Sequence, residues 1–253
     1  ADLIGTAAGF ATTGKIPFAS TFAHFAAGRA FDQIRNSVAY PKLNVKICPT
    51  HAGVSLGEDG GSHQSVEDMA LMRSLPGMVV LSPADAVETE KMIFAAAEYE
   101  GPVYVRLGRL NIPVLFDDNY KFEIGKAVTL TEGNDVAILA TGLMVYEATE
   151  AAKQLAEQGI KARVVNVSTI KPLDEETILK AAKECKFIVT SEEHSVIGGL
   201  GSAVSEFLSE NHPTKVIKHG IQDVFGQSAD GDTMLNNYKL RAKDIVEVVL
   251  RNR

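Results

Sequence analysis

Short apolar, β-branched runs alternate along this chain with longer segments in which apolar residues recur every three or four positions. In the first half, the apolar runs cover residues 16–22, 45–49, 78–81 and 103–106, and the amphipathic segments cover residues 25–38, 65–73 and 84–99. Strands that alternate with helices predict a parallel sheet with helices packed on its faces. The first half is therefore predicted to be an α/β domain.

The same alternation returns in the second half. Apolar runs cover residues 136–140, 163–167, 187–190 and 215–219, and amphipathic segments cover residues 146–158, 174–183, 202–209 and 242–251. Between the halves, residues 110–130 lose the pattern and carry Asn, Asp and Pro. We predict two three-layer α/β domains with mainly parallel sheets, at residues 1–115 and 133–253, joined by a linker at residues 116–132.

Several local signals refine the second domain. Gly159 follows an amphipathic segment, as a helix C-cap does, and Asp174 precedes the next one as an N-cap. The glycines of residues 198–201 lack the spacing of a dinucleotide-binding fingerprint, so they predict a turn into a helix. Asp230-Gly231-Asp232 is predicted to be a turn only.

Charge and cysteine content exclude several classes of function. The net charge is −7 and no basic cluster is present, which argues against partners such as nucleic acid or anionic membranes. No apolar stretch is long enough to span a bilayer, and no signal-peptide pattern is visible at the start. Cys48 and Cys185 lie in or beside apolar runs, which predicts buried free thiols and a cytoplasmic protein.

A glycine-rich loop at residues 50–64 carries the densest chemistry of the chain. It holds two histidines, two adjacent carboxylates and four glycines directly after the apolar run 45–49. Ligand sites of α/β proteins form in loops at the carboxyl ends of strands, and glycines let the backbone approach a ligand closely. The alternative is a solvated surface loop, but this loop is rich in titratable groups for its length.

Three side chains of this loop, His51, Asp59 and His63, are the candidate catalytic residues. Their spacing matches no common zinc pattern, so no metal site is predicted in this chain. Neutral imidazole and carboxylate both accept hydrogen bonds from sugar hydroxyls, and both exchange protons near neutral pH. We therefore favour a proton-transfer and hydroxyl-binding cluster, the alternative being ordinary satisfied histidines.

Two further sets of residues lie at neighbouring strand ends. Phe22 and Phe25 are three positions apart at a strand-to-helix corner, so their rings can face one side and hold a flat heteroaromatic ring. Arg109 follows the run 103–106 at the same edge as His51, where a guanidinium suits phosphate recognition. The alternatives are core packing for the phenylalanines and a surface salt bridge for Arg109.

In order along the chain, these motifs closely resemble the transketolase family. They are Ser-Thr-Phe-x-x-Phe, then Thr-His-Ala-Gly-(x)3-Gly-Glu-Asp-Gly-x-x-His-Gln, then Gly-Arg-x-Asn-x-Pro. The resemblance covers essentially the whole chain and is closest to the separate C-terminal subunit of split transketolases, a pyrimidine-binding domain followed by the C-terminal domain. It implies transfer of a two-carbon ketol unit from a ketose phosphate to an aldose phosphate.

The resemblance also implies thiamine diphosphate as cofactor and a role for each matched residue. Phe22 and Phe25 match aromatic residues that hold the aminopyrimidine ring, and His63 matches a residue near the reactive centre of the cofactor. His51 and Asp59 match residues that bind sugar substrates and assist proton transfer. Arg109 matches an arginine that binds the sugar phosphate.

Two departures from the family pattern change what we expect of this chain. The activating glutamate of the family belongs directly before Ala1, so the first domain is expected to be N-terminally incomplete. Gly28 replaces an aromatic residue of many full-length members. The motif that holds Mg2+ and the diphosphate belongs to another domain, so we expect a partner subunit that supplies it and a homo- or hetero-oligomer of at least two chains.

Two other functions stay open from the sequence. A 1-deoxyxylulose-5-phosphate synthase uses pyruvate, but such enzymes typically carry Asp-Arg-Ala-Gly where this chain has Thr50-His51-Ala52-Gly53. A non-catalytic dimerisation or regulatory subunit is the other possibility. The joint presence of the candidate catalytic residues and Arg109 argues against a mere scaffold.

Overall fold

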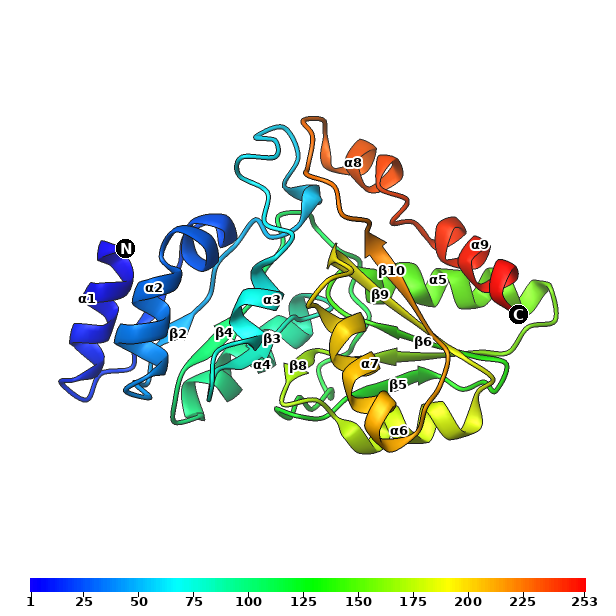
Figure 1. The fold of residues 1–253 in the computed structure, drawn as a ribbon, viewed down its shortest axis with the longest axis horizontal. Helices are drawn as coiled ribbons and strands as arrows, with labels where there is room; N and C mark the ends of the chain where they lie inside the picture. Colours follow the sequence, from blue (N-terminus) through cyan, green and yellow to red (C-terminus); the bar gives the residue numbers. More distant parts are fainter.

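The computed structural model describes residues 1–253 and contains two five-stranded sheets, one in each half of the chain (Figure 1). The first sheet has the order β1-β2-β4-β3-β8, and only β8 is antiparallel to its neighbour. Its strands are β1 (Phe18–Ala19), β2 (Lys46–Ile47), β3 (Val79–Leu81), β4 (Val103–Val105) and β8 (Thr169–Lys171). The mainly parallel sheet predicted for the first half is confirmed.

The second sheet has the order β10-β9-β6-β7-β5, again with one antiparallel edge strand, β5. Its strands are β5 (Val128–Thr131), β6 (Val136–Ala140), β7 (Ala162–Asn166), β9 (Ile188–Ser195) and β10 (Val216–Ile221). Strands β6, β7 and β9 are buried along almost their whole length, as expected when helices cover both faces of a parallel sheet. The α/β fold class with mainly parallel sheets is confirmed.

The helices of the first half are shorter and less regular than the amphipathic pattern predicts. They are α1 (Asp2–Ala11), η1 (His24–Arg29), α2 (Phe31–Gln33), η2 (Ile34–Ala39), η3 (Val54–Leu56), α3 (Asp68–Arg73) and α4 (Ala86–Glu98). The single helix expected over residues 25–38 is instead two π-helical turns, η1 and η2, around one α-helical turn. In η1 the Ala30 N–H donates to Phe25 O over five residues. Such widened turns are typical of functional sites.

The helices of the second half follow the predicted pattern closely. They are α5 (Met144–Glu157), α6 (Glu175–Glu184), α7 (Leu200–Asn211), α8 (Gly231–Asn237) and α9 (Ala242–Asn252). Asp174 caps α6 through the Thr177 N–H, and Gly159 has a φ of 75° after α5, so both predicted caps are confirmed. The prediction for Asp230-Gly231-Asp232 was wrong, because Asp230 is the N-cap of α8 rather than part of an isolated turn.

The predicted linker contains more structure than its sequence suggests. Residues 128–131 form β5, because this short run pairs with β7 and so closes the edge of the second sheet. The amides of Leu115 and Phe116, where the first domain meets the linker, donate to the Asp85 carboxylate at the start of α4. The linker is therefore anchored to both halves, and the boundaries at residues 115 and 133 stay a prediction.

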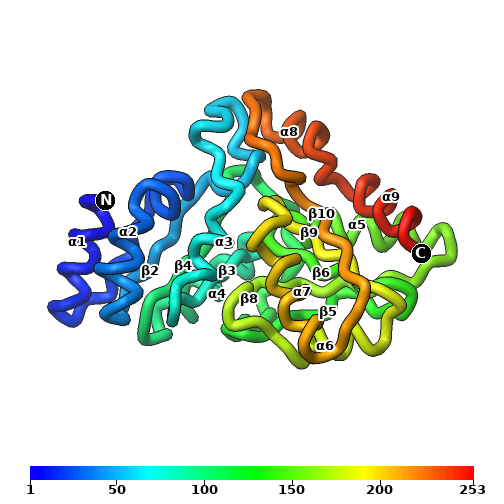
Figure 2. Tube along the Cα trace, viewed as in Figure 1, coloured from blue at the N-terminus to red at the C-terminus, as the bar shows by residue number.

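The largest of three hydrophobic clusters spans both halves of the chain. A single cluster of 31 buried residues runs from Ile4 and Tyr104 in the first half to Leu139 and Val204 in the second. Strand β8 also joins the two halves, because it lies in the second half of the sequence and pairs with β3 in the first sheet. The chain trace in Figure 2 shows the two halves packed side by side along this seam.

Cys48 and Cys185 are buried and free, as predicted. No helix of the structure has the length and apolar character that a membrane span requires.

Candidate active site

An aromatic stack forms at the carboxyl end of the first sheet. Phe22 and Phe25 lie with parallel rings, 6.0 Å between centroids and 4° between planes. His51 stacks on Phe22 at 4.1 Å and 16°. The strand ends explain this approach, because Phe22 and Thr50 form a parallel bridge that brings the two segments together. The prediction that the phenylalanines face one side is confirmed.

His63 closes the stack from its edge. Its imidazole lies 5.2 Å from the Phe25 ring and 6.2 Å from the Phe22 ring, nearly perpendicular to both. Its Nδ1 lies 3.0 Å from Ser62 Oγ. The structure therefore brings His51 and His63, twelve positions apart, to the same pair of rings.

The loop reaches this arrangement through unusual backbone angles. His51 has a φ of 63°, in the left-handed region that non-glycine residues seldom adopt, and Gly53 and Gly57 have φ of 85° and 95°. A strained backbone at a polar residue is common where the surrounding structure fixes a functional side chain. Glycine at 53 and 57 is what allows the chain to turn sharply on either side of η3.

Arg109 lies at the same edge and closes the other side of the loop. Its Nη1 donates to Leu56 O and lies 3.3 Å from Glu58 Oε2 and 4.0 Å from Asp59 Oδ2. These carboxylates are exposed, and such ion pairs contribute about 0 to 1 kcal/mol, so an anionic ligand can replace them at low cost. Arg109 therefore lies at the predicted sheet edge and also forms the surface ion pair that was the alternative expectation.

A pocket of about 470 Å³ opens beside Arg109. Its wall includes Ser55 and Leu56 from the loop and Asp230 and Gly231 from the start of α8. The pocket thus lies between the glycine-rich loop and the second half of the chain.

The surroundings of His51 lower its pKa. Burial is the largest cause, the Arg109 guanidinium adds to it, and the Asp59 carboxylate opposes both. Because the ordinary pKa of histidine is about 6.5, a lowered value keeps the imidazole neutral at neutral pH. A neutral imidazole can accept a proton from a substrate hydroxyl.

This balance predicts opposite pKa shifts in two variants. Asp59→Asn removes the charge that stabilises the imidazolium, so the pKa of His51 should fall further. Arg109→Ala removes a repelling cation, so the pKa of His51 should rise towards its ordinary value. NMR titration of the His51 ring measures both shifts, and shifts in the same direction would contradict the proposed electrostatics.

The site combines apolar ring faces with polar edges. The half-buried faces of Phe22 and Phe25 offer apolar contact, and the imidazoles offer polar edges. Beside them, a Cβ atom on Gly28 would meet only the His24 imidazole, at 3.7 Å, so space is open there. His24 Nδ1 is buried without a hydrogen-bond partner and lies 3.9 Å from Glu67 Oε1. No group of three or more metal-binding side chains occurs in the chain.

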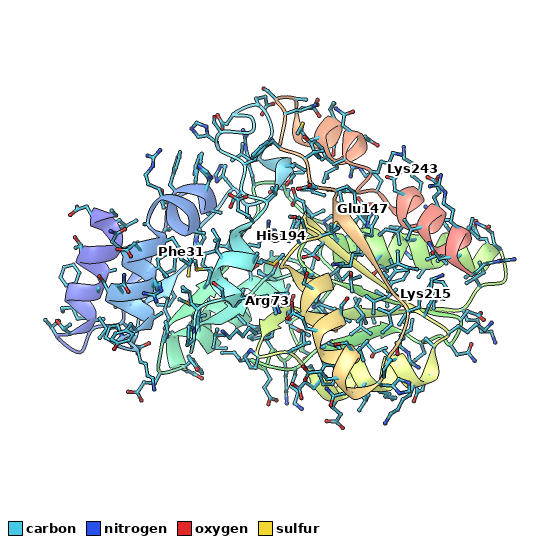
Figure 3. All side chains as sticks on the ribbon, viewed as in Figure 1. Phe31, Arg73, Glu147, His194, Lys215 and Lys243 are labelled. Carbon is cyan, nitrogen blue, oxygen red and sulfur yellow. The ribbon has the colours of Figure 1, made fainter.

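The sequence analysis missed a buried polar network behind the loop. Arg106 and Asp68 form an ion pair with 2.9 Å between Nε and Oδ2, and the Tyr104 hydroxyl also donates to Oδ2 at 2.9 Å. Arg106 Nη2 also donates to the backbone oxygen of Glu193 in β9 at 2.9 Å. The neighbouring His194 is fully buried, and Figure 3 places it at the seam between the halves. The signal was present, because Glu192-Glu193-His194 extends an apolar strand with charged residues.

Comparison with known proteins identifies the two domains. Residues 1–114 match the transketolase pyrimidine-binding domain, and residues 125–245 match the transketolase C-terminal domain. The chain is thus a protein that joins these two domains in that order. It belongs to the transketolase family.

Three relatives show how far the likeness extends. A putative transketolase C-terminal section from Methanocaldococcus jannaschii is 50% identical over 252 residues, which are 98% of this chain and 79% of that protein. A 6-deoxy-6-sulfo-D-fructose transketolase subunit from a Clostridium species is 46% identical over 97% of this chain and 76% of its own length. A solved structure described as a split gene transketolase, inactive beta4 tetramer, is 54% identical, with a TM-score of 0.93 over 99% of this chain and 80% of that one.

Proposed function

We propose that this chain is the C-terminal subunit of a split transketolase. In the active assembly, it transfers a two-carbon ketol unit from a ketose phosphate to an aldose phosphate, in the cytoplasm. The observation that carries the proposal is the convergence of Phe22, Phe25, His51, His63 and the Asp59–Arg109 pair at one sheet edge. The names of the relatives, a C-terminal section and a subunit, support the division into two chains.

Each side chain of the site has a role that its geometry supports. Phe22 and Phe25 hold the pyrimidine ring of thiamine diphosphate, whose bound form supplies the electron sink for breaking a carbon–carbon bond. His63 lies against both rings and orients polar groups at their edge. His51, neutral and stacked on Phe22, accepts the hydroxyl proton of the ketose, while Asp59 binds a substrate hydroxyl.

The other half of the active site lies in a partner. No metal-binding cluster occurs in this chain, so the proposal assigns Mg2+ and the diphosphate to an N-terminal transketolase subunit. The related structure is described as an inactive tetramer of one subunit, which agrees with this division. The active assembly would therefore contain at least one copy of each subunit.

A reconstitution assay tests the proposal. The full-length subunit is mixed with its N-terminal partner, thiamine diphosphate and Mg2+, and ketol transfer from xylulose 5-phosphate to ribose 5-phosphate is measured. Turnover with both subunits and none with either alone is expected. Consumption of pyruvate instead would indicate a 1-deoxyxylulose-5-phosphate synthase. An inactive but stable complex would indicate a non-catalytic dimerisation or regulatory subunit.

The proposed role of Arg109 predicts a selective loss. Arg109 is partly exposed, so Arg109→Ala should weaken transition-state binding of phosphorylated sugars by about 1.5 to 3 kcal/mol, the usual worth of a hydrogen bond to a charged group. The measurement compares kcat/KM for xylulose 5-phosphate and unphosphorylated xylulose. Arg35→Ala, a change at an exposed arginine outside the site, serves as control. Equal losses with both sugars would remove Arg109 from phosphate recognition.

A further inference from the structure

The loop that carries the candidate catalytic residues is fixed from the second half of the chain. Glu193 of β9 accepts the Ser55 N–H through Oε1 at 2.6 Å, and only 3% of Glu193 is exposed. A carboxylate that accepts a backbone N–H in a buried setting forms a strong, charge-assisted hydrogen bond. This bond lies four residues after His51 and four before Asp59, in the middle of the loop.

The contact between Glu193 and the loop is close enough to require glycine. A Cβ atom at Gly53 would lie 2.2 Å from the carboxyl carbon of Glu193, where no side chain fits. Gly53 also has a φ of 85°, which glycine adopts without strain. Position 53 is therefore restricted twice, by its backbone angle and by the carboxylate packed against it.

Glu193 is itself held in place by the buried network. Arg106 Nη2 donates to the backbone oxygen of Glu193 at 2.9 Å, while its Nε pairs with Asp68. Both partners of this ion pair are almost fully buried, with 6% and 0% of their side chains exposed. The carboxylate that meets the loop thus rests on a rigid support.

A second contact from the same half holds the far end of the loop. The Gln64 amide donates to Gln227 O at 2.9 Å, and Ser228 Oγ donates to Glu58 O at 2.6 Å. A Cβ atom at Gly226 would lie 1.5 Å from Gln64 Oε1, so the two segments touch directly. Figure 1 shows this segment, before α8, alongside the loop.

We propose that the C-terminal domain sets the conformation of the catalytic loop and that Glu193 is the positioning residue for His51 and Asp59. Glu193 acts through Ser55 and Gly53, the two loop residues that its carboxylate contacts. The inference rests on the proposed function for its kinetic consequence. The contact by which Glu193 holds the loop does not depend on that function.

Hydrogen exchange tests the clamp directly on the full chain. In Glu193→Ala, amides of residues 50–64 should exchange about tenfold faster or more, because the loop loses its central bond. The matched control is Glu147→Ala, which removes another buried carboxylate that accepts a backbone N–H, that of Ala242, away from the loop. Equal exchange of the loop in both variants would overturn the proposal.

A milder pair of variants keeps the test open if Glu193→Ala does not fold. Glu193→Gln retains an acceptor for the Ser55 N–H but loses its charge, so loop exchange should rise about threefold to tenfold. Glu147→Gln should leave the loop at the wild-type rate. A loop in Glu193→Gln that exchanges no faster than in Glu147→Gln would contradict the clamp.

The kinetic arm uses the complex with the N-terminal subunit. Glu193→Ala should lower kcat for ketol transfer about tenfold to a hundredfold with KM changed less than threefold, and Glu193→Gln should restore most of it. If Glu193 only stabilised the fold, Glu147→Ala would lower kcat as much as Glu193→Ala does. Glu193→Gln would then show no selective recovery of kcat. If the wild-type complex transfers no ketol unit, the proposed function fails, while the exchange result still decides the clamp.

Discussion

Replacing Asp68 with alanine is expected to lower the free energy of unfolding by about 3 to 5 kcal/mol, because Arg106 is left as a buried charge without its partner. Tyr104 loses its hydrogen-bond acceptor in the same step. The neighbouring carboxylate of Glu193 offsets part of the charge but its side chain is committed to Ser55. Urea denaturation measures this loss as a lower midpoint concentration, and the slope of the free energy against urea concentration should stay unchanged.

Two controls separate the buried charge from other effects of the substitution. Glu150→Ala breaks an exposed pair with Lys153, so its cost should stay below about 1 kcal/mol. The double variant Asp68→Leu with Arg106→Met removes both buried charges and should recover most of the stability lost in Asp68→Ala. A double variant as unstable as the single one would show that the charge is not the cause.

Replacing His51 with alanine is expected to lower kcat/KM for ketol transfer by a factor of about 10² to 10⁴, the usual contribution of a general base. The ring is stacked on Phe22, and its hydrogen bond in this structure joins Nδ1 to Thr50 Oγ1 at 2.7 Å. In the tautomer in which Nδ1 donates to Thr50 Oγ1, Nε2 carries the lone pair that can take a substrate proton. Burial and Arg109 lower the pKa of the ring, so it is neutral at the pH of the assay.

The control for this variant is a histidine away from the site. His212 lies just after α7, so His212→Ala should change kcat/KM less than twofold. Cofactor affinity, followed by fluorescence quenching on titration with thiamine diphosphate, should change little in His51→Ala if the residue acts on the substrate. An active His51→Ala enzyme would exclude the proposed proton transfer.

Much of the fold followed from periodicity because its strands are buried on both faces. Residues 136–140 form β6 as predicted, and the segment 242–251 forms all but the end of α9. The errors have two causes. Strands β5 and β8 pair through backbone hydrogen bonds at sheet edges, which leave little trace in side-chain pattern. The π-helical turns η1 and η2 keep an apolar face, so the sequence predicts an ordinary helix there.

The residues of the candidate site could be predicted from local motifs, whereas the buried residues that hold the loop in place could not. Phe22, His51 and Arg109 each lie three or four positions after the end of a strand, and parallel strands end at one edge, so their proximity was predictable. The Glu193 carboxylate meets Ser55 across 138 positions of sequence. Such a contact depends on how the two halves pack against each other, and the local hydrophobic pattern of either half does not predict that packing.

Strand β8 also limits how this protein can be divided or recombined. It crosses from the second half to pair with β3, so a fragment of residues 1–115 would expose a bare sheet edge and would be prone to aggregate. A chimera that borrows the second domain from a distant homologue would have to preserve the backbone course of residues 169–171 to seal that edge. The practical unit for engineering is therefore the whole polypeptide, even though it contains two recognisable domains.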